Sequence, residues 1–448
     1  MLSALLLARR GVRVAVVDDD RAVLPADPDH AGRWPRRGVS QLHQTHGFLG
    51  AFHAVLRAEL PDVLADLIAQ GAEERDLTGL AIARGFPPDR GADVKVLLAR
   101  RSTVELVLRR AVHREPCVDL YTGHPVREIL VERGRVHGVR TVGGGVEAPL
   151  VVDASGRRRS RWEGWYQTLG DSSAQLAYVT RMYVLRDGAD PGPLPRVSGA
   201  GVIADGYHTV INLHDNRTFS AVLACLPRDR ELLVLRHEEL FQRVMASVPI
   251  TGPWVEPARS RPLSPPVPMT NMRNAVRSVR ATAPAGFFAV GDALATTDPA
   301  RGFGASMAAV SAAWLADGIV QHLGDPVAAR EYVAARTEPW ILDWYHDTIG
   351  HSAARSDRWS AVIAGERVSR FAPVPRPTPA YVAFQLASAD GDEWWHKRRY
   401  SQLLEPPCAV ARRHAAREER DGPVATSVET VMADVPTRAE LLDRIRET

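Results

Sequence analysis

Residues 286–319 read GFFAVGDALATTDPARGFGASMAAVSAAWLADGI, and this stretch decides the fold. It opens with the apolar run Phe287–Val290, which has the length of a buried strand and stands between glycines. A turn with Asp292 follows, and then a polar loop that contains Pro299, Gly302 and Gly304. The alanine-rich residues 305–315 have high helix propensity. The predicted order is strand, acidic turn, loop and helix.

This order indicates a ligand site at the end of the strand. A carboxylate at that position, here Asp292, can accept hydrogen bonds from a sugar-like diol. Gly302 and Gly304 carry no Cβ, so the backbone can approach a flat ligand closely. The helix start presents free N–H groups and a partial positive charge to an anion. The alternative is an ordinary strand–loop–helix of an α/β protein, which a Gly-Asp pair alone would favour.

The whole pattern over residues 291–308 is Gly-Asp-Ala followed by Pro-x-x-Gly-x-Gly-x-x-x-Ala. It resembles the second FAD-binding motif of flavin monooxygenases with the para-hydroxybenzoate-hydroxylase fold. The resemblance implies that Asp292 holds the ribityl chain of FAD. It also implies that Pro299, Gly302 and Gly304 lie along the isoalloxazine ring. The helix after Gly304 would then point its positive end at the flavin pyrimidine, where reduced flavin carries negative charge.

The N-terminal residues resemble another part of the same fold. Residues 2–10 form a predicted apolar helix that Gly11 caps, and Val12–Val17 form a strand that leads to Asp18. This resembles the second half of a dinucleotide-binding βαβ unit, in which Asp18 binds the adenosine ribose hydroxyls. Without the downstream motif, a solvated acidic turn would be the better interpretation of Asp18.

The first strand of that unit and its Gly-x-Gly-x-x-Gly loop, which cradles the FAD pyrophosphate, do not precede this helix. Loss of a central strand leaves buried backbone hydrogen bonds unpaired. Two hypotheses follow. Either Met1 is a misplaced start and roughly 15–20 residues, one strand plus its loop, are missing, or the protein is a truncated relative that binds FAD poorly. The intact mass of the natively produced protein distinguishes them.

Residues 34–50, WPRRGVSQLHQTHGFLG, resemble the Arg-x-Gly-Val-Pro-Gln-x-Arg-His-x-His stretch of polyether-type flavin epoxidases and related tailoring oxygenases. The resemblance implies a loop near the flavin, with Arg37 in contact with the cofactor. Two of its histidines have no third ligand at suitable spacing, so structural histidines are favoured over a metal site. The matching residues are Arg37, Gly38, Val39, Gln41 and His46, whereas Ser40, His43 and Gln44 replace a proline, an arginine and a histidine.

Two further residues are assigned to FAD by the resemblance. The family places an arginine against the cofactor just before a helix, and Arg101, before Ser102–Val112, is the closest match. An exposed arginine at a helix start is an equally good interpretation. Val126 begins one of three short predicted strands and would contact adenine through its backbone. These strands cover residues 118–121, 126–132 and 135–142.

Residues 150–156, LVVDASG, form a further predicted strand, and its end at Asp153 and Gly156 resembles the third shared motif, which approaches the cofactor. A basic segment follows it. This segment could attract the phosphates of NADPH or FAD, or a carrier protein, although a solvated loop is the preferred interpretation. Its arginines are Arg157, Arg158, Arg159 and Arg161.

The expected fold class is α/β, with a Rossmann-like three-layer FAD-binding domain, an inserted mixed or antiparallel sheet, and a helical C-terminal region. Long alternating strands at 176–185, 209–213 and 218–226 predict the inserted, substrate-binding sheet. The expected bounds are 1–165 for the first FAD-binding part (with a helical or loop insertion at about 30–93), 166–274 for the sheet, 275–323 for the second FAD-binding part, and 324–448 for the C-terminal region.

Composition excludes several other classes. The 448 residues include 56 basic and 53 acidic ones, so no basic field indicates nucleic-acid binding. The three cysteines, Cys117, Cys225 and Cys408, are far apart, which fits a reduced, cytoplasmic protein and neither a disulfide frame nor a metal site. No apolar run has the length of a membrane span. The oligomeric state cannot be read from the sequence.

The sequence therefore predicts an FAD-dependent monooxygenase, a hydroxylase or epoxidase, for a small apolar or aromatic molecule of secondary metabolism such as antibiotic biosynthesis. The family mechanism implies that FAD, reduced by NADPH or NADH, reacts with dioxygen to a C4a-hydroperoxide, which passes its distal oxygen to the substrate. The cofactor carries this chemistry, so no catalytic side chain is assigned. The alternatives are a flavin dehydrogenase or reductase of the geranylgeranyl-reductase type, and a non-catalytic relative without the phosphate loop.

Overall fold

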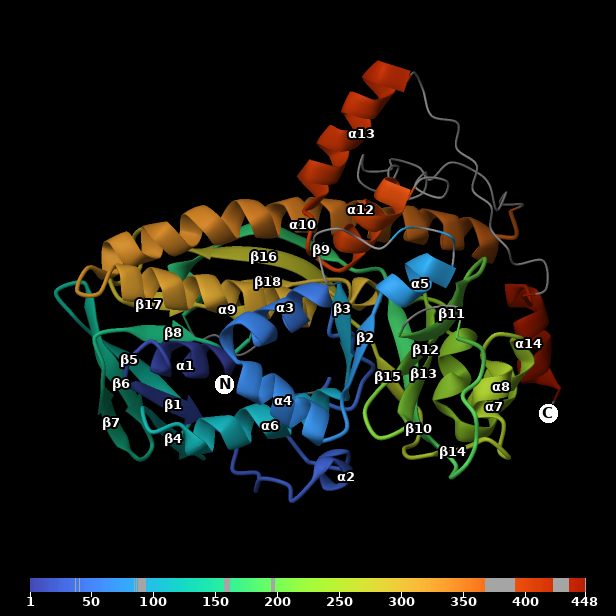
Figure 1. Cartoon of the computed structure of the whole chain (residues 1–448), viewed down its shortest axis with the longest axis horizontal. Coiled ribbons are helices and arrows are strands. Elements are labelled where there is room, and N and C mark those ends of the chain that lie inside the picture. Colours follow the sequence, from blue (N-terminus) through green and yellow to red (C-terminus); the bar gives the residue numbers. More distant parts are fainter. Residues whose placement is uncertain are drawn as a thin grey trace.

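The computed structural model describes residues 1–36, 38–39, 41–83, 85, 87, 94–156, 162–194, 198–366, 391–421 and 435–447. The molecule is elongated, with a mixed α/β part at one end and an antiparallel sheet at the other (Figure 1). One long helix, α10, runs across both parts. Arg37, the segment with Arg157 to Arg161, and part of the predicted insertion lie outside the described residues.

The helices α1 to α6 are interspersed with three strands, and the ten strands β4 to β13 then follow without an α-helix between them. The helices are α1 (Leu2–Ala8), α2 (Pro28–Ala31), α3 (Gly50–Glu59), α4 (Pro61–Ala69), α5 (Thr78–Ala83), α6 (Arg101–Arg114), α7 (Glu238–Ser247), α8 (Gly252–Val255), α9 (Gly304–Gln321), α10 (Pro326–Ile363), α12 (Gly391–Ser401), α13 (Pro407–Asp421) and α14 (Arg438–Arg446). The strands are β1 (Val14–Asp18), β2 (Glu73–Asp76), β3 (Lys95–Leu98), β4 (Val118–Thr122), β5 (Val126–Glu132), β6 (Arg135–Thr141), β7 (Gly144–Glu147), β8 (Val151–Asp153), β9 (Tyr166–Ser173), β10 (Ala177–Leu185), β11 (Gly199–Ile203), β12 (His208–Leu213), β13 (Thr218–Cys225), β14 (Ser260–Pro262), β15 (Val267–Met269), β16 (Arg273–Val279), β17 (Phe287–Ala289) and β18 (Ala295–Thr296).

Two parallel strand pairs form the centre of the first part. β1 pairs with β4, and β8 pairs with β17. The helices α1, α3, α6 and α9 bury their apolar faces in one core beside them. α1 enters this core because its sequence, LSALLLA, is apolar on nearly every side. Gly11 then turns the chain toward β1 with a φ of 82°, which other residues rarely adopt.

The second part is an antiparallel sheet in the order β11-β12-β13-β10-β14, with β15 also paired to β10. Its outer face packs on α7, α8 and α14 (Figure 1). Alternate residues of the strands supply that core, as the period of two requires. Tyr183 stacks on Phe219, which meets Trp254 edge-on. The antiparallel pairing of β13 with β10 and with β12 confirms the antiparallel strands predicted in this region.

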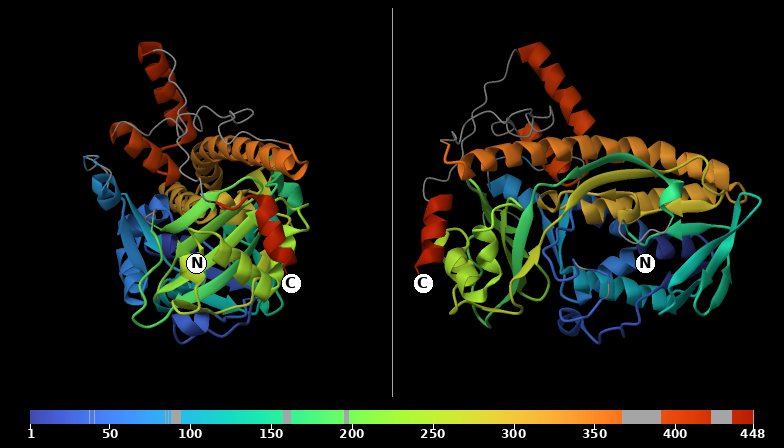
Figure 2. Two further views of the ribbon diagram at one scale, coloured as in Figure 1. Left: turned by 90° about the vertical axis from the view of Figure 1, so that its right-hand side faces the viewer. Right: turned by 180° about the vertical axis from the view of Figure 1, so that it is seen from behind.

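A third sheet joins the two parts. Its order is β18-β16-β9, and α10 packs along it. α10 begins where the Asp325 side chain accepts hydrogen bonds from the N–H groups of Val327 and Ala328, both at 3.1 Å. α12 packs beside α10, and α13 projects from the body of the molecule (Figure 2).

The fold class predicted from the sequence is confirmed. The predicted strands at 118–121, 126–132 and 135–142 correspond to β4, β5 and β6. The domain bounds given above stay a prediction. Among the described residues, none of the helices has both the length and the apolar character that a bilayer crossing requires.

Candidate functional site

The parallel pairing of β8 and β17 brings two predicted site elements together. Both strands end at the same edge, where Asp292 and Gly156 face each other. A Cβ atom on Gly156, which has a φ of 79°, would lie 3.9 Å from the Asp292 Cβ. Since residues 153–156 and 291–293 are far apart in sequence, only the strand register creates this pair.

Arg277 stabilises the turn that carries Asp292 by a hydrogen bond to its backbone. Its Nε donates to the Ala293 carbonyl at 3.0 Å, and its guanidinium carbon lies 4.5 Å from the centre of the Tyr166 ring. The Tyr166 hydroxyl donates to Asp153 Oδ2 at 2.6 Å. A buried chain of side chains thus links the ends of both strands. The sequence reasoning missed Arg277, because nothing in its spacing marks it.

The Asp292 carboxylate reaches solvent but is surrounded by protein. Its side chain is exposed, and yet burial raises the pKa of Asp292 above its ordinary value. Arg101 and a weak hydrogen bond from Gln41 Nε2, at 3.4 Å, counter this rise. We call the space bordered by Asp292, Gly302, Gly304 and Leu49 the recess, because a Cβ atom built on either of these two glycines would have its nearest neighbour at 3.9–4.0 Å. The recess leaves the carboxylate available to hydroxyl donors of a ligand.

The glycines of the loop have few close neighbours among the residues that the structure describes. A Cβ atom on Gly302 would have Leu49 Cδ1 as its nearest neighbour at 4.0 Å, and one on Gly304 would have Thr297 Oγ1 at 3.9 Å. Protein packing therefore does not require Gly304, whereas Gly302 adopts a φ of 69°. Helix α9 begins at Gly304 without a side-chain cap and without an acidic residue in its first turn. These features fit a flat ligand with an anionic edge.

His46 and Arg101 lie near the same recess. Burial, together with the charge of Arg101, lowers the pKa of His46 to about 3, so the imidazole is neutral at pH 7. Its Nδ1 lies 3.0 Å from the Gln44 carbonyl and must be the protonated nitrogen, because a carbonyl only accepts. Within the described ranges, no three His, Cys, Asp or Glu side chains gather as a metal site.

Asp18 is surrounded by cations of the protein itself. Its carboxylate accepts hydrogen bonds from the Asp20 N–H at 3.1 Å, from Arg36 at 3.3 Å and from Arg109. Burial by itself raises the pKa of Asp18. The hydrogen bonds and the charges of the two arginines lower the pKa by more than burial raises it, so the net shift is downward. A carboxylate offers about four lone-pair positions, and donors among the described residues occupy three of them. Glu105 pairs with the same two arginines.

The predicted residues fall into two groups. Asp292, Gly302, Gly304 and Arg101 lie around the recess, with Pro299 at the start of the 3-10 turn Pro299–Arg301. Asp18 and Val126 form the second group, because the His124 N–H donates to the Asp18 carbonyl at 3.0 Å. Arg37 and the Arg157 to Arg161 segment lie outside the described residues. In the sequence Gln41 is only a motif match, whereas in the structure its Nε2 lies 3.4 Å from Asp292 Oδ2.

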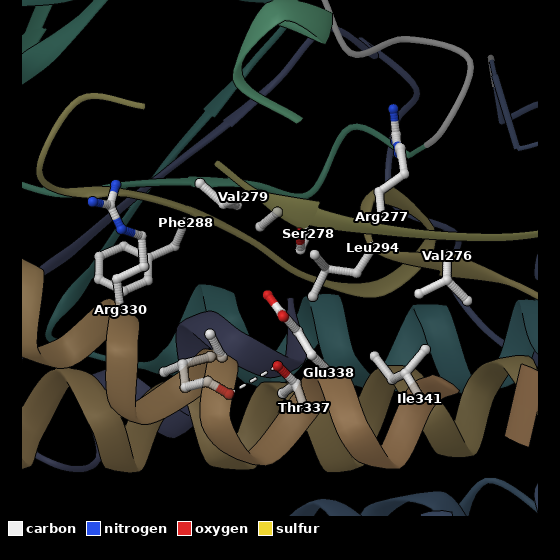
Figure 3. Close-up of a pocket in the computed structure, with 13 residues that line it drawn as sticks. Val276, Arg277, Ser278, Val279, Phe288, Leu294, Arg330, Thr337, Glu338 and Ile341 are labelled. Carbon is white, nitrogen blue, oxygen red and sulfur yellow. Dashed lines mark hydrogen bonds between the residues drawn. The ribbon is translucent and has the colours of Figure 1, made fainter. Parts of the chain in front are cut away.

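A separate small cavity lies between β16, β17 and α10 (Figure 3). Its volume is about 30 Å³, enough for about one water molecule. Most of its lining is apolar, and the Glu338 side chain points into it (Figure 3). Burial raises the pKa of Glu338. The cavity is too small for a cofactor or an organic substrate.

The sequence matches no protein-family model and no curated protein. Solved structures do share its fold. PqsL from Pseudomonas aeruginosa, a probable FAD-dependent monooxygenase, aligns over 81% of this chain and 96% of its own at 16% identity, with a TM-score of 0.58. The flavin-dependent brominase Bmp2 aligns over 81% and 86% at 14% identity, TM-score 0.56. A variant of HpxO from Klebsiella pneumoniae, in complex with FAD, aligns over 81% and 90% at 14% identity, TM-score 0.55.

The fold is that of FAD-dependent monooxygenases. This confirms the fold that the motif at residues 291–308 predicted. At these identities the likeness concerns the fold, and the assignment of individual site residues stays with the geometry described above.

Proposed function

We propose that this protein is an FAD-dependent monooxygenase that uses NADPH or NADH and dioxygen to oxidise a small apolar or aromatic molecule. The observation that supports it most strongly is the recess at residues 291–304. There, an exposed but partly desolvated carboxylate, two glycines with open space beside them and an uncapped helix start converge. The HpxO variant, which shares this fold, is in complex with FAD in its own structure.

The residues of the recess fit FAD. Asp292 would accept hydrogen bonds from the ribityl hydroxyls, and Arg101 would balance its charge. Gly302 and Gly304 would leave room for the ring, with the start of α9 toward its anionic edge. Asp18 and Val126 would lie at the adenosine end. Bound FAD supplies the electrons that activate dioxygen, and the protein positions it and excludes water.

The inner face of the antiparallel sheet supports an apolar substrate. Tyr178, Val222 and Met269 form an apolar cluster on the face opposite to α7, where Trp359 and Ile363 of α10 pack against part of it. Burial, with a smaller contribution from Asp298, raises the pKa of the Tyr178 phenol, so it stays protonated at neutral pH. Thr45 accepts hydrogen bonds from Asn212 at 2.7 Å and Ser220 at 2.8 Å, which places the loop at 41–48 on this face. We infer that the substrate lies between this face and the flavin ring.

The resemblance of residues 34–50 to flavin epoxidases favours a substrate from secondary metabolism. The neutral His46 and the amide of Gln41 belong to this loop and lie near the recess. Neither carries a net charge at pH 7 that would recruit a charged substrate. A double bond or an electron-rich ring is the reacting group that suits this surrounding.

The test has two steps. The purified protein is first dialysed with FAD, and the bound flavin is read from its visible absorption. Its reduction by NADPH is then followed without oxygen, and product formed under oxygen-18 gas is analysed by mass spectrometry. Incorporation of one labelled oxygen atom supports a monooxygenase. A protein that takes up no FAD contradicts the proposal, and unlabelled oxidised product indicates a flavin dehydrogenase.

A further inference from the structure

The loop that carries Pro299, Gly302 and Gly304 is tied to α10 by two ion pairs that run in opposite directions. Arg301 of the loop pairs with Asp347 of α10 at 3.1 Å. Arg355 of α10 pairs with Asp298 of the loop at 2.5 Å. Both aspartates are nearly inaccessible to solvent. Because the two pairs run in opposite directions, an exchange of partners between them would bring like charges together.

Tyr400, near the end of α12, completes the first of these pairs. Its hydroxyl donates to Asp347 Oδ2 at 2.5 Å and accepts from the Arg301 guanidinium at 2.7 Å. The Tyr400 ring stacks on Trp344 with ring centres 5.4 Å apart, and Trp344 meets Phe303 of the loop edge-on at 4.9 Å. Tyr400 is fully buried. The C-terminal region therefore contacts the loop through the hydrogen bonds of the Tyr400 hydroxyl and through the aromatic contacts of Tyr400, Trp344 and Phe303.

The next residues of the C-terminal region hold the opposite wall of the recess. Gln402 Oε1 accepts from the Gly50 N–H at 2.9 Å, and the Gln402 carbonyl accepts from the Ala51 N–H at 3.0 Å. These two N–H groups belong to the start of α3, which has no side-chain cap of its own. Leu49, the residue before α3, is the nearest neighbour of the open space at Gly302.

The residue that follows Gln402 is in a backbone conformation that leucine rarely adopts. Leu403 has a φ of 57° and is buried. Its N–H donates to the Tyr400 carbonyl at 3.1 Å, and the Leu404 N–H donates to the Arg399 carbonyl at 2.9 Å. Helices commonly end this way with glycine, whereas a leucine at this φ is strained. The surrounding contacts therefore hold this turn in place.

We propose that the turn Tyr400–Leu404 is a positioning element of the cofactor site, with Tyr400 and Gln402 as positioning residues. Tyr400 fixes the loop that lies along one side of the recess, and Gln402 fixes the start of α3 on the other side. The C-terminal region would thus set the width of the recess without touching the cofactor. This inference rests on the proposed function.

The test compares wild-type protein with Tyr400→Phe and Gln402→Met. Each variant keeps the size of the side chain and removes its hydrogen bonds. We expect the dissociation constant for FAD, measured by quenching of flavin fluorescence, to rise about tenfold in each variant. In the FAD-free proteins, we expect backbone hydrogen exchange to be faster than in the wild type at residues 297–304 of Tyr400→Phe and at residues 49–52 of Gln402→Met.

Tyr183→Phe is the matched control. It also removes a buried tyrosine hydroxyl bond, to Gln242 at 2.8 Å, but on the outer face of the antiparallel sheet. It should lower the melting temperature, by less than Tyr400→Phe because Gln242 is an amide and Asp347 a carboxylate, and leave FAD affinity and exchange at the recess unchanged. FAD affinity within twofold of wild type in both turn variants overturns the inference. Failure of the wild type to bind FAD contradicts the proposed function instead, while the exchange data still report whether the turn holds the two walls.

Discussion

Asp292→Asn should weaken FAD binding without weakening the fold. Among the residues that the structure describes, the carboxylate has one weak hydrogen-bond partner, Gln41 at 3.4 Å, so the substitution removes little bonding between these residues. A neutral amide accepts hydrogen bonds about half as strongly as a carboxylate, which is a loss of about 1–1.5 kcal/mol per ligand hydroxyl. We therefore expect the dissociation constant for FAD to rise roughly tenfold.

The effect on stability follows from the pKa of Asp292. Because burial raises that pKa in the folded state, the ionised carboxylate destabilises the fold once pH exceeds the unfolded value. This loss grows as pH rises toward the folded pKa and is complete above it. The amide removes the loss, so at pH 7 the FAD-free variant should melt at or slightly above the wild-type temperature. The gain is small, because an exposed group is screened by water.

Asp153→Asn is the contrasting variant at the neighbouring strand end. The Asp153 carboxylate accepts from the Tyr166 hydroxyl and the Ser155 hydroxyl, both at 2.6 Å, and from the Ser155 N–H at 2.9 Å. The substitution Asp153→Asn should lower the free energy of unfolding by about 1–3 kcal/mol. Differential scanning fluorimetry and FAD titration of both variants decide the matter. If Asp292→Asn lowers the melting temperature as much as Asp153→Asn, or leaves FAD affinity unchanged, Asp292 is a structural residue and our interpretation is refuted.

Three further predictions concern the loop, the ion pairs and pH. Gly304→Ala should leave the melting temperature of the FAD-free protein unchanged or raise it, because the nearest neighbour of a Cβ atom there lies at 3.9 Å and alanine favours the helix. A fluorescence titration should show that the same variant binds FAD at least several-fold more weakly. Asp347→Asn should lower the free energy of unfolding, measured with urea, by about 3 kcal/mol, because it leaves the buried Arg301 without its carboxylate partner. The double variant Arg301→Met/Asp347→Leu should recover most of that loss. Burial lowers the pKa of His46 to about 3 and that of His214 to about 4. In the unfolded chain both histidines have a pKa near 6.5, so below that pH the unfolded state binds protons that the folded state does not. The free energy of unfolding should therefore be highest above about pH 6.5 and should decline as pH falls below it. Urea unfolding at pH 7.5 and 5.5 should show this decline, at most about 1.4 kcal/mol per pH unit for each histidine, and His214→Gln should reduce it; equal stability of the wild type at both pH values contradicts the prediction.

The sequence by itself determined the local elements and the main motif. The apolar run at Phe287–Val290, the loop glycines and the alanine-rich helix act over a few residues each, so their conformations follow from propensity and hydrophobic period. The observed β17 and α9 agree with this prediction, as do β4 to β6 and the long antiparallel strands. For the same reason, the fold class could be predicted from residues 291–308 together with the N-terminal strand.

Only the tertiary structure decided which side chains meet. Gln41 reaches Asp292 across 251 positions, and Tyr400 reaches Arg301 across 99. The paired state of Asp18 depends on Arg109, which lies 91 positions away on α6. Such contacts depend on strand register and helix packing, and a local pattern carries no information about them. The motif therefore located the recess, while its walls, its electrostatics and the role of the C-terminal turn came from the packing of distant segments.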